Sequence, residues 1–386
     1  MDISEILNNY GEEREMYFNA AAPPIVQASN YIFKTVDEMR ESLAHEDETF
    51  FYTRGNNPTT LILQKKMAAL EHTEDALIFA SGSAAIGAAV MANLQAGDHV
   101  VCVRKPYSWT TKLLQNILSR YGVTHTFVEG DEVANFEKAI QANTKIIYLE
   151  SPNSWTFEMQ DLEAVLKIAK SIGILSIVDN SYASPLNMTP ADWGADIIVH
   201  SGTKYLSGHS DTVAGVLCAS AAMCKKIFKS EFMTLGGIIS PFNAWLLIRG
   251  LRTLSIRMEK VAQTTPQVVD FLSKHPKVAK VYYPFSPSHP QYELAKKQMK
   301  RPAGQFTIVL ATEKPEEVER FCNSLTRFLM GCSWGGYESL IFPAATLYSS
   351  QNYQTKDLPY NMIRFYCGLE EPQELIADLQ QAFDKI

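Results

Sequence analysis

Apolar residues along the chain fall into short continuous runs and longer segments with helical spacing. The short runs are rich in β-branched side chains and occupy residues 76–79, 99–103, 146–149, 174–178 and 197–199. Runs of this length are typical of buried strands. Helical spacing occupies intervening segments such as residues 59–69 and 162–172. Strands that alternate with helices predict an α/β fold, with a mostly parallel sheet covered on both faces.

The pattern changes at both ends of this α/β region. Near the N-terminus, Pro23-Pro24 and the acidic tract 46–48 interrupt every periodic segment, which predicts an arm that packs on another surface. A long helical segment over residues 244–254 leads out of the large domain and into a smaller α+β layer. We therefore predict an arm (1–57), a large domain (58–245) and a C-terminal α+β domain (246–386).

Composition and charge narrow the class of ligand. The 386 residues are 46% hydrophobic and 20% charged, as in ordinary globular proteins. A net charge of −7 without a basic stripe argues against nucleic acid or an anionic membrane as partner. The N-terminus lacks the order of a signal peptide, and no run of about 18 apolar residues occurs. We expect a small-molecule ligand.

The six cysteines are scattered and mostly adjoin apolar residues, with neither a Cys-x-x-Cys pair nor histidines at zinc spacing. They indicate reduced thiols in a cytoplasmic protein, and no metal site is expected.

Two predicted strands end in side chains of opposite charge. One ends at Asp179, and the next leads to Lys204 in a loop of small and hydroxyl-bearing residues. The carboxyl ends of parallel strands meet at one sheet edge, where α/β folds bind ligands. Such a pair suits pyridoxal phosphate, which needs a lysine for a Schiff base and an anionic partner for its pyridinium nitrogen. The alternative is a solvated loop lysine and an aspartate that caps a turn.

A phosphate site is predicted where the strand 76–79 turns through Ser81, Gly82 and Ser83 into a helix, because a helix N-terminus attracts anions. The turn lacks the lysine motif of a nucleotide P-loop and the glycine pattern of a dinucleotide fold, which argues against ATP and NAD.

Two aromatic positions complete the candidates in this part of the chain. Tyr52 and Arg54 lie two residues apart on an extended segment, where they either clamp a phosphate or form an ordinary surface pair. Tyr107 follows the strand 99–103 and either stacks on an aromatic cofactor or is a surface aromatic.

Arg364 lies in the otherwise apolar run 362–365. A guanidinium in such a strand has to pair with an anion. The partner is either a substrate carboxylate or a structural one, with Glu338 and Glu370 as the structural options.

Together these features resemble the Cys/Met-metabolism family of pyridoxal-phosphate enzymes, which includes cystathionine γ-synthase, cystathionine β- and γ-lyases, methionine γ-lyase and O-acylhomoserine sulfhydrylases. The likeness runs from about residue 31 to the C-terminus. Its most specific segment is residues 201–211, supported by the stretches 52–54, 179–180, 249–254 and 336–341. The resemblance implies a fold type I enzyme.

The resemblance also implies a role for each candidate. Lys204 forms the Schiff base and moves protons, Asp179 pairs with the pyridine nitrogen, and Tyr107 stacks on the ring. The implied phosphate contacts are Gly82, Ser83, Ser201, Thr203, Tyr52 and Arg54. The last two reach over from a neighbouring subunit, and family members are usually tetramers built as pairs of dimers. Arg364, with Ser333 nearby, holds the substrate α-carboxylate.

Departures from the family pattern lie where specificity is decided. Ser108 and Trp109 stand in place of a Gly-Gly pair, and Ser83 in place of a methionine. Ser154 takes the place of an asparagine near the cofactor's phenolic oxygen; the enteric type of cystathionine β-lyase also has a serine there and shares the Ser-Trp-Gly-Gly pattern of residues 333–336. Just before that pattern, Cys332 replaces the glutamate of synthases and γ-lyases and the tyrosine of the β-lyase. We expect Trp109, Ser154, Cys332 and Trp334 to choose the substrate.

The resemblance implies a carbon–sulfur lyase that acts on cystathionine or a related sulfur amino acid by β- or γ-elimination. Lys204 would remove the Cα proton while Arg364 fixes the substrate. The same lysine can perform a second proton shift, so γ-replacement on an O-acylhomoserine, as in cystathionine γ-synthase, is the alternative. A remote alternative is a protein of this fold that binds without catalysis.

Overall fold

The chain forms two compact units in the computed structural model, which describes residues 1–351 and 357–386. The first unit comprises Met1–Ser151, Gln160–Ser207 and Asp211–Thr253, and the second comprises Pro152–Met159, Gly208–Ser210 and Leu254–Ile386. The division therefore falls after Thr253, and residue 245 lies inside the helix α10 (Pro241–Leu251). Residues 1–57 group with the first unit.

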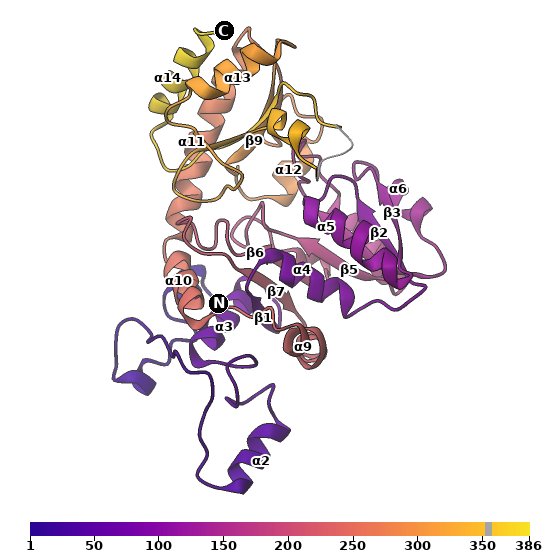
Figure 1. The fold of residues 1–386 in the computed structure, drawn as a ribbon, viewed down its shortest axis with the longest axis vertical. Helices are drawn as coiled ribbons and strands as arrows, with labels where there is room; N and C mark the ends of the chain where they lie inside the picture. The colour runs from indigo at the N-terminus through magenta and orange to yellow at the C-terminus, as the bar shows by residue number, and fades with distance from the viewer. Residues whose placement is uncertain (352–356) are drawn as a thin grey trace. The chain divides into compact units, whose positions relative to one another are not determined.

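A seven-stranded sheet forms the centre of the first unit (Figure 1). Its strands are β1 (Asp75–Phe79), β2 (His99–Val103), β3 (Thr124–Val128), β4 (Thr144–Glu150), β5 (Leu175–Asp179), β6 (Ile197–Ser201) and β7 (Gly215–Ala219). The spatial order is β1-β7-β6-β5-β4-β2-β3. Neighbouring strands from β3 to β6 pair in parallel, whereas β7 runs antiparallel to β1 and β6. The prediction of a mostly parallel sheet is confirmed.

Helices cover this sheet because its strands are apolar on both faces. Ile197 and Val199 pack into a core cluster with α4, whereas the alternate residue His200 points to the other face and contacts Glu71, directly after α3. The helices of this unit are α1 (Ile3–Asn8), α2 (Val36–Ala44), α3 (Pro58–Leu70), α4 (Gly82–Met91), α5 (Ser108–Lys112), α6 (Val133–Ala139), α7 (Leu162–Ser171), α8 (Ala221–Ile227), α9 (Met233–Leu235) and α10. Shorter helical turns are η1 (Arg14–Tyr17), η2 (Leu113–Ile117), η3 (Leu118–Tyr121), η4 (Pro190–Trp193) and η5 (Phe228–Phe232).

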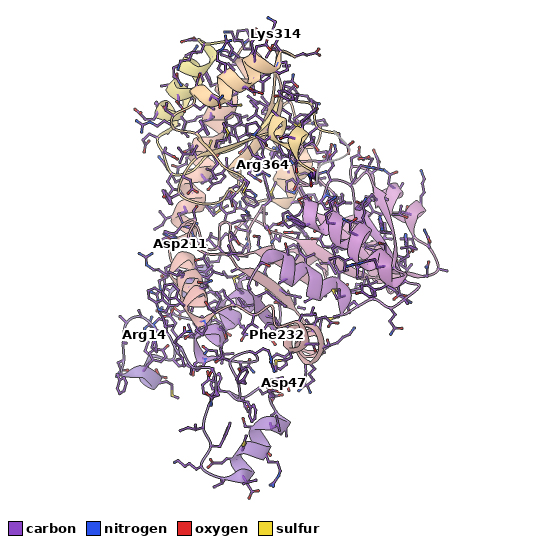
Figure 2. All side chains as sticks on the ribbon, in the orientation of Figure 1. Arg14, Asp47, Asp211, Phe232, Lys314 and Arg364 are labelled. Atoms are coloured by element: carbon purple, nitrogen blue, oxygen red, sulfur yellow. The ribbon has the colours of Figure 1, made fainter. Side chains whose placement is uncertain are left out.

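The N-terminal arm leaves large apolar side chains uncovered. Its helix α2, capped by the Thr35 hydroxyl, projects away from the sheet of the first unit (Figure 1). Phe18 is 99% exposed and Ile32 is 95% exposed. The arm is tied back at Asp47 (Figure 2), which lies 2.6 Å from the Lys225 amine; the hydrogen bond from Lys225 helps to hold the pKa of Asp47 below its usual value against the opposing effect of burial.

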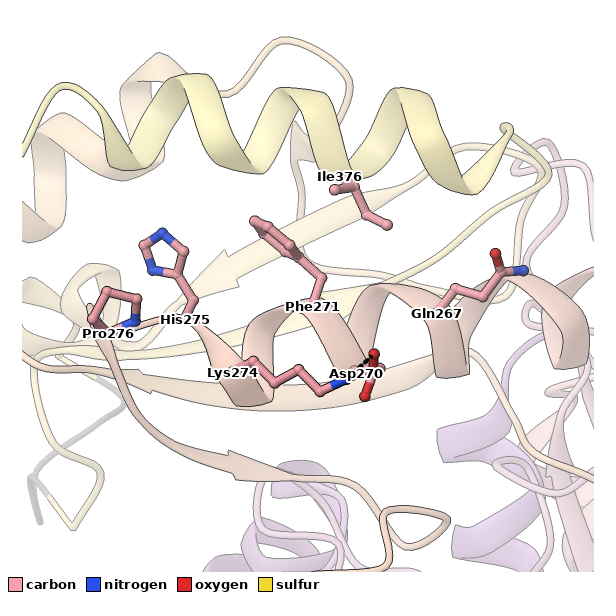
Figure 3. Close-up of a pocket in the computed structure, with 7 residues that line it drawn as sticks. All are labelled: Gln267, Asp270, Phe271, Lys274, His275, Pro276 and Ile376. Carbon is pink, nitrogen blue, oxygen red and sulfur yellow. Dashed lines mark hydrogen bonds and ion pairs between the residues drawn. The ribbon is translucent and has the colours of Figure 1, made fainter.

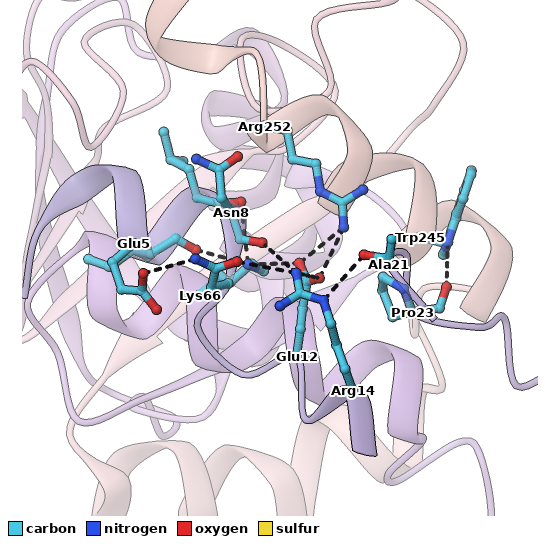
Figure 4. A network of polar contacts seen from close by, with 12 residues as sticks. Glu5, Asn8, Glu12, Arg14, Ala21, Pro23, Lys66, Trp245 and Arg252 are labelled. Carbon is cyan, nitrogen blue, oxygen red and sulfur yellow. Dashed lines mark hydrogen bonds and ion pairs between the residues drawn. The ribbon is translucent and has the colours of Figure 1, made fainter. Parts of the chain in front are cut away.

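A buried ionic cluster anchors the beginning of the chain (Figure 4). The Glu12 carboxylate is fully buried and lies 3.1 Å from the amine of Lys66, which is also fully buried. Arg252 donates to both Glu12 oxygens at 3.1 Å, and Arg14 donates to one of them at 3.1 Å. Lys66 also donates to the carbonyl oxygens of Ile6 and Leu7 at the end of α1. Burial lowers the pKa of Lys66, and Glu12 opposes this effect.

The second unit is an α+β layer built on a five-stranded sheet in the order β10-β11-β12-β9-β8. All pairs are antiparallel except β10 with β11. Its elements are α11 (Leu254–Lys274), β8 (Val278–Tyr282), α12 (Tyr292–Gln298), β9 (Gln305–Leu310), α13 (Pro315–Ser324), β10 (Leu329–Met330), β11 (Leu340–Pro343), η6 (Ala344–Ser349), β12 (Met362–Tyr366) and α14 (Pro372–Phe383).

One face of this second sheet is packed against helices and the other carries Arg364. Ile363 and Phe365 share a core with residues of α11, α13 and α14. Arg364 lies between them on β12 and therefore faces the opposite side (Figure 2). Strand alternation thus explains how a charged residue occurs within an apolar run.

A surface pocket lies on the helical layer of the second unit (Figure 3). It is lined by Gln267, Asp270, Phe271, Lys274, His275, Pro276 and Ile376. Lys274 and Asp270 form an ion pair of 2.7 Å on its rim, and none of the predicted site residues lines it.

Among the helices of the described chain, none is long and apolar enough to cross a membrane.

Candidate active site

The carboxyl edge of the parallel strands brings several predicted residues together. Asp179 ends β5, where it is paired in register with Glu150 of β4 and with Val199 of β6. Ser201 ends β6 two residues later. This placement follows from parallel pairing alone, because each strand delivers its last side chains to the same edge.

Asp179 is a buried carboxylate, only 7% exposed. One of its oxygens accepts the Ser181 backbone N–H at 2.9 Å. Burial raises the pKa of Asp179, although hydrogen bonds from Ser181 and Tyr148 and the nearby His200 act to lower it. A carboxylate in this state is stabilised by a cationic partner that lies against it.

Tyr148 was missed by the sequence analysis. It is fully buried on β4, where it is paired in register with Ile177, and its hydroxyl oxygen accepts from the Thr110 hydroxyl at 3.4 Å. It also lies near enough to Asp179 to act on the pKa of that carboxylate. Burial raises its pKa well above the usual value, with the neighbouring carboxylates adding to the effect. Its hydroxyl group therefore stays neutral. The sequence did not indicate a role for Tyr148, because a tyrosine within the apolar run 146–149 is expected simply to pack in the core.

Glu71 joins a second buried group behind Asp179, on the opposite face of the sheet. Its Oε1 lies 2.5 Å from Nε2 of His200 and 2.8 Å from Nδ2 of Asn180. Asn180 also donates to the Met188 carbonyl at 2.8 Å. These bonds fix the residues that directly follow Asp179 and precede Ser201.

The N-terminus of α4 forms a narrow cradle beside Ser201. The Ser81 hydroxyl caps the helix by accepting the Ala84 N–H at 3.1 Å, which leaves the earlier N–H groups of the first turn outside the helical ladder. A Cβ on Gly82 would lie 3.1 Å from the Cα of Ser201, and one on Gly215 would clash with the Ser81 carbonyl oxygen. Only glycine permits this close approach.

Lys204 lies in the loop between β6 and β7. Its backbone N–H donates to the Ser201 carbonyl at 3.2 Å. The Thr203 hydroxyl donates to the Ala214 carbonyl at 3.3 Å and accepts the Ala214 N–H at 3.1 Å. The loop is thus closed at its base on both sides of the lysine.

Tyr107 is tied to the same sheet edge. Its backbone N–H donates to Oε2 of Glu150 at 2.6 Å, and its side chain is 39% exposed. It directly precedes α5, on which Trp109 is 55% exposed. Ser83, in the first turn of α4, is likewise exposed.

Tyr52 and Arg54 remain within the arm. The Arg54 guanidinium carbon lies 5.4 Å from the centre of the Tyr52 ring, and Tyr52 forms a bridge with Asn30. In the described ranges, neither side chain has a hydrogen bond or ion pair with the residues at the N-terminus of α4.

Arg364 of the second unit lies beside aromatic rings and pairs with neither Glu338 nor Glu370. It is half-buried, and its Nη2 donates to the Cys332 carbonyl at 2.8 Å. Its guanidinium carbon lies 5.4 Å from the Trp155 ring and 5.2 Å from the Phe342 ring. Burial lowers its pKa to about 10.

The two structural options for an Arg364 partner are engaged elsewhere. Glu370 accepts from the backbone N–H and hydroxyl of Ser339, and Glu338 accepts from the Ser210 hydroxyl. Over residues 1–351 and 357–386, no carboxylate lies within ion-pair distance of Arg364, and the remaining five residues include no acid.

The other predicted substrate residues of the second unit are Cys332, Ser333, Trp334 and Ser154. Cys332 is exposed, two residues after β10, while the other three are half-buried. Trp155 and Phe342 were missed, although Trp155 occupies the place of the proline that follows the asparagine in the family pattern.

Comparison with known proteins shows which family the chain belongs to. The family model described as Cys/Met metabolism PLP-dependent enzyme matches residues 5–384. The chain belongs to this family. It is 38% identical over 378 residues to an L-methionine gamma-lyase of Fusobacterium nucleatum, covering 96% of this chain and 95% of that protein. It is 35% identical over 381 residues to cystathionine gamma-synthase 1 of Arabidopsis thaliana, covering 97% of this chain and 67% of the relative.

The fold also matches a solved structure. The crystal structure of metB from Corynebacterium glutamicum matches with a TM-score of 0.92 and 32% identity, over 100% of this chain and 98% of that one. The fold type and family predictions are thereby confirmed, together with pyridoxal phosphate as the cofactor.

The residues at the sheet edge fit that cofactor. Asp179 is a buried carboxylate that favours a cationic partner, and the glycine-lined N-terminus of α4 offers N–H groups to a phosphate. Lys204 supplies an amine from a closed loop, and Tyr107 presents an aromatic side chain after β2.

Proposed function

We propose that the protein is a carbon–sulfur lyase that acts on a sulfur-containing amino acid by β- or γ-elimination. The observation that carries the proposal is the gathering of Asp179, Ser201 and Gly82 at one sheet edge with the loop of Lys204. Membership of the family and the similarity to an L-methionine gamma-lyase support it.

The cofactor, when bound, supplies an electron sink for charge that develops on the substrate. Asp179 keeps the ring nitrogen protonated, and Tyr107 stacks on the ring. Lys204 holds the cofactor and moves protons at the substrate Cα. The N–H groups of Gly82 and Ser83, with Ser201, bind the phosphate. We propose that Thr203, whose hydroxyl also bonds to Ala214 within the loop, is a further phosphate contact.

On the substrate side, we propose that Arg364 binds the α-carboxylate. Among the described residues no carboxylate pairs with this guanidinium, which supports the assignment, since its remaining N–H groups match a carboxylate in a bidentate manner. Ser154, Cys332, Ser333 and Trp334 of the second unit, and Trp109 of the first, are the proposed determinants of the side chain accepted.

The reaction type is tested by the keto acid that the purified enzyme releases. Given L-cystathionine or L-methionine, pyruvate would identify β-elimination and 2-oxobutyrate would identify γ-elimination. We expect one of these products from at least one substrate. If neither forms, while cystathionine is made from an O-acylhomoserine and cysteine, the γ-synthase alternative favoured by the Arabidopsis relative replaces the lyase proposal. Absence of every reaction would leave only a binding role.

We further propose a homotetramer built from dimers, in which Tyr52 and Arg54 complete the phosphate site of the neighbouring subunit. The exposed apolar side chains of the arm support an interface there, because patches of this kind are rarely left in water. Among the described residues, neither side chain bonds to the N-terminus of α4 in its own chain, which is in keeping with this sharing.

Mixing two inactive variants tests this sharing. Arg54→Ala and Lys204→Ala, unfolded together and refolded, should regain roughly a quarter of wild-type activity, because about half of the random dimers are hybrids and each holds one intact site. Each variant refolded alone is the control. Failure of the mixture to exceed those controls would place both residues in the site of their own chain.

A further inference from the structure

The rings of Trp155 and Phe342 form an unusual support for Arg364. The ring centres lie 5.4 Å apart with planes inclined by 40°. Since the guanidinium carbon lies 5.4 Å and 5.2 Å from these centres, the three groups form a nearly equilateral triangle. The guanidinium therefore rests against both rings from one side, within the range of cation–π attraction.

The two rings belong to segments that are far apart in the sequence. Phe342 is the cross-strand neighbour of Arg364 in the β11–β12 pair, so that ordinary sheet geometry brings them together. Trp155 comes from residues 152–159, a segment remote in sequence that joins the second unit. Its contact with Arg364 thus depends on how this segment is held.

Several bonds hold Trp155 in a strained turn. Trp155 has a φ of +71°, and the N–H of Thr156 donates to the carbonyl of Ser154 at 2.9 Å, which closes a three-residue turn around it. Asn153 and Glu158 bond across the turn, at 3.0 Å and 3.1 Å through their backbone N–H groups. Turns of this kind with a positive central φ are rare and strained, and they persist where the surroundings fix them.

The end of the segment is fastened as well. The Met159 N–H donates to the Gln291 side chain at 2.8 Å, and the same amide donates back to the Met159 carbonyl at 2.6 Å. A large aromatic residue in this conformation is costly, and here its ring lies against the Arg364 guanidinium.

We propose that Trp155 is a positioning residue that holds Arg364 in orientation to bind the substrate carboxylate, a role that rests on the proposed function of Arg364. The ring removes water from one side of the guanidinium while its attraction for the cation keeps the group in place. The Nη2 bond to Cys332 fixes a second point. The remaining N–H groups then lie in a defined plane for a bidentate carboxylate.

The test compares two ligands that differ only in the carboxylate. L-methionine and L-methionine amide are each mixed with the holoenzyme by stopped flow, and Kd is taken from the change in cofactor absorbance before turnover consumes the ligand. KM and kcat are measured separately for L-methionine. In Trp155→Ala we expect the Kd of L-methionine to rise roughly tenfold and that of the amide to change less than about twofold. We expect kcat to stay within about threefold, and Trp155→Phe to restore most of the affinity.

Two further variants make the result decisive. In an Arg364→Ala background, Trp155→Ala should produce no additional loss for L-methionine, because the two residues act through one contact. Trp193→Ala, which removes another half-buried tryptophan, should not discriminate between acid and amide. Equal losses for both ligands, or no loss for L-methionine, would overturn the proposal and leave Trp155 a packing residue.

The binding comparison also separates this inference from the proposed function. A wild-type enzyme that releases no keto acid overturns the lyase, yet preference for the acid over the amide is still measured without turnover. A wild type that binds the acid no better than the amide would overturn the role of Trp155 itself.

Discussion

Lys204→Ala lowers the rate of keto-acid release by roughly a thousandfold or more, because it removes the amine proposed both to hold the cofactor and to move the Cα proton. The fold should be unaffected, since the loop is closed by bonds of Ser201, Thr203 and Ala214 that do not involve the side chain of residue 204. The measurement is kcat/KM on whichever sulfur amino acid the wild type accepts, with thermal unfolding to check the fold.

A matched control and a chemical readout accompany this variant. Lys145→Ala removes an exposed lysine from β4 of the same unit and should keep nearly full activity. Borohydride treatment followed by peptide mass spectrometry should fix the cofactor to the wild-type peptide that contains Lys204. Retention of more than about a tenth of the activity by Lys204→Ala, or attachment at another lysine, would show that the amine has been misassigned.

Glu12→Gln lowers the free energy of unfolding by about 3–5 kcal/mol, the usual cost of leaving a buried charge uncompensated. Glu12 and Lys66 are both fully buried, so the neutral amide would leave the Lys66 cation without its counter-ion. Arg14 and Arg252 keep partial access to water and suffer less. Urea unfolding followed by tryptophan fluorescence measures the change.

The neighbouring residue provides the control. Glu13 pairs with Lys65 at 2.8 Å, but both side chains are exposed, and Glu13→Gln should cost less than about 1 kcal/mol. Adding Lys66→Met to Glu12→Gln should recover much of the lost stability, because the unpaired charge is then gone. Similar costs for Glu12→Gln and Glu13→Gln would mean that the buried cluster does not anchor the start of the chain.

The strands of the first sheet were predictable because their apolar runs are short and sharply bounded. The run 99–103 coincides with β2, and the run 174–178 differs from β5 by one residue at each end. The strand β7 was missed, although residues 213–219 form a short apolar run. The run alone does not show that this strand pairs antiparallel to β6. The single helix expected over 244–254 is also divided in the structure, where α10 ends at Leu251 and α11 begins at Leu254.

For the candidate site, sequence reasoning located the residues that end strands, namely Asp179 and Ser201, because parallel pairing dictates their common edge. It also singled out Arg364, although only the structure gives its aromatic neighbours. Trp155 could not be found in this way, because its role depends on a positive φ and on bonds from Gln291, 132 positions away, to its segment. Tyr148 was also missed, because a tyrosine in a buried strand is common and does not by itself indicate a function.

The antiparallel strand β7 has a consequence for how the chain forms the loop that carries Lys204. Ser201 pairs with Gly215 across the mouth of the Lys204 loop, so this contact closes over only 14 positions (215 − 201). The pairing of Asp179 with Val199 spans 20 positions (199 − 179) and a full crossover. Closing the shorter loop costs less chain entropy. The lysine is therefore positioned by a short antiparallel connection, whereas Asp179 is positioned by a longer crossover connection.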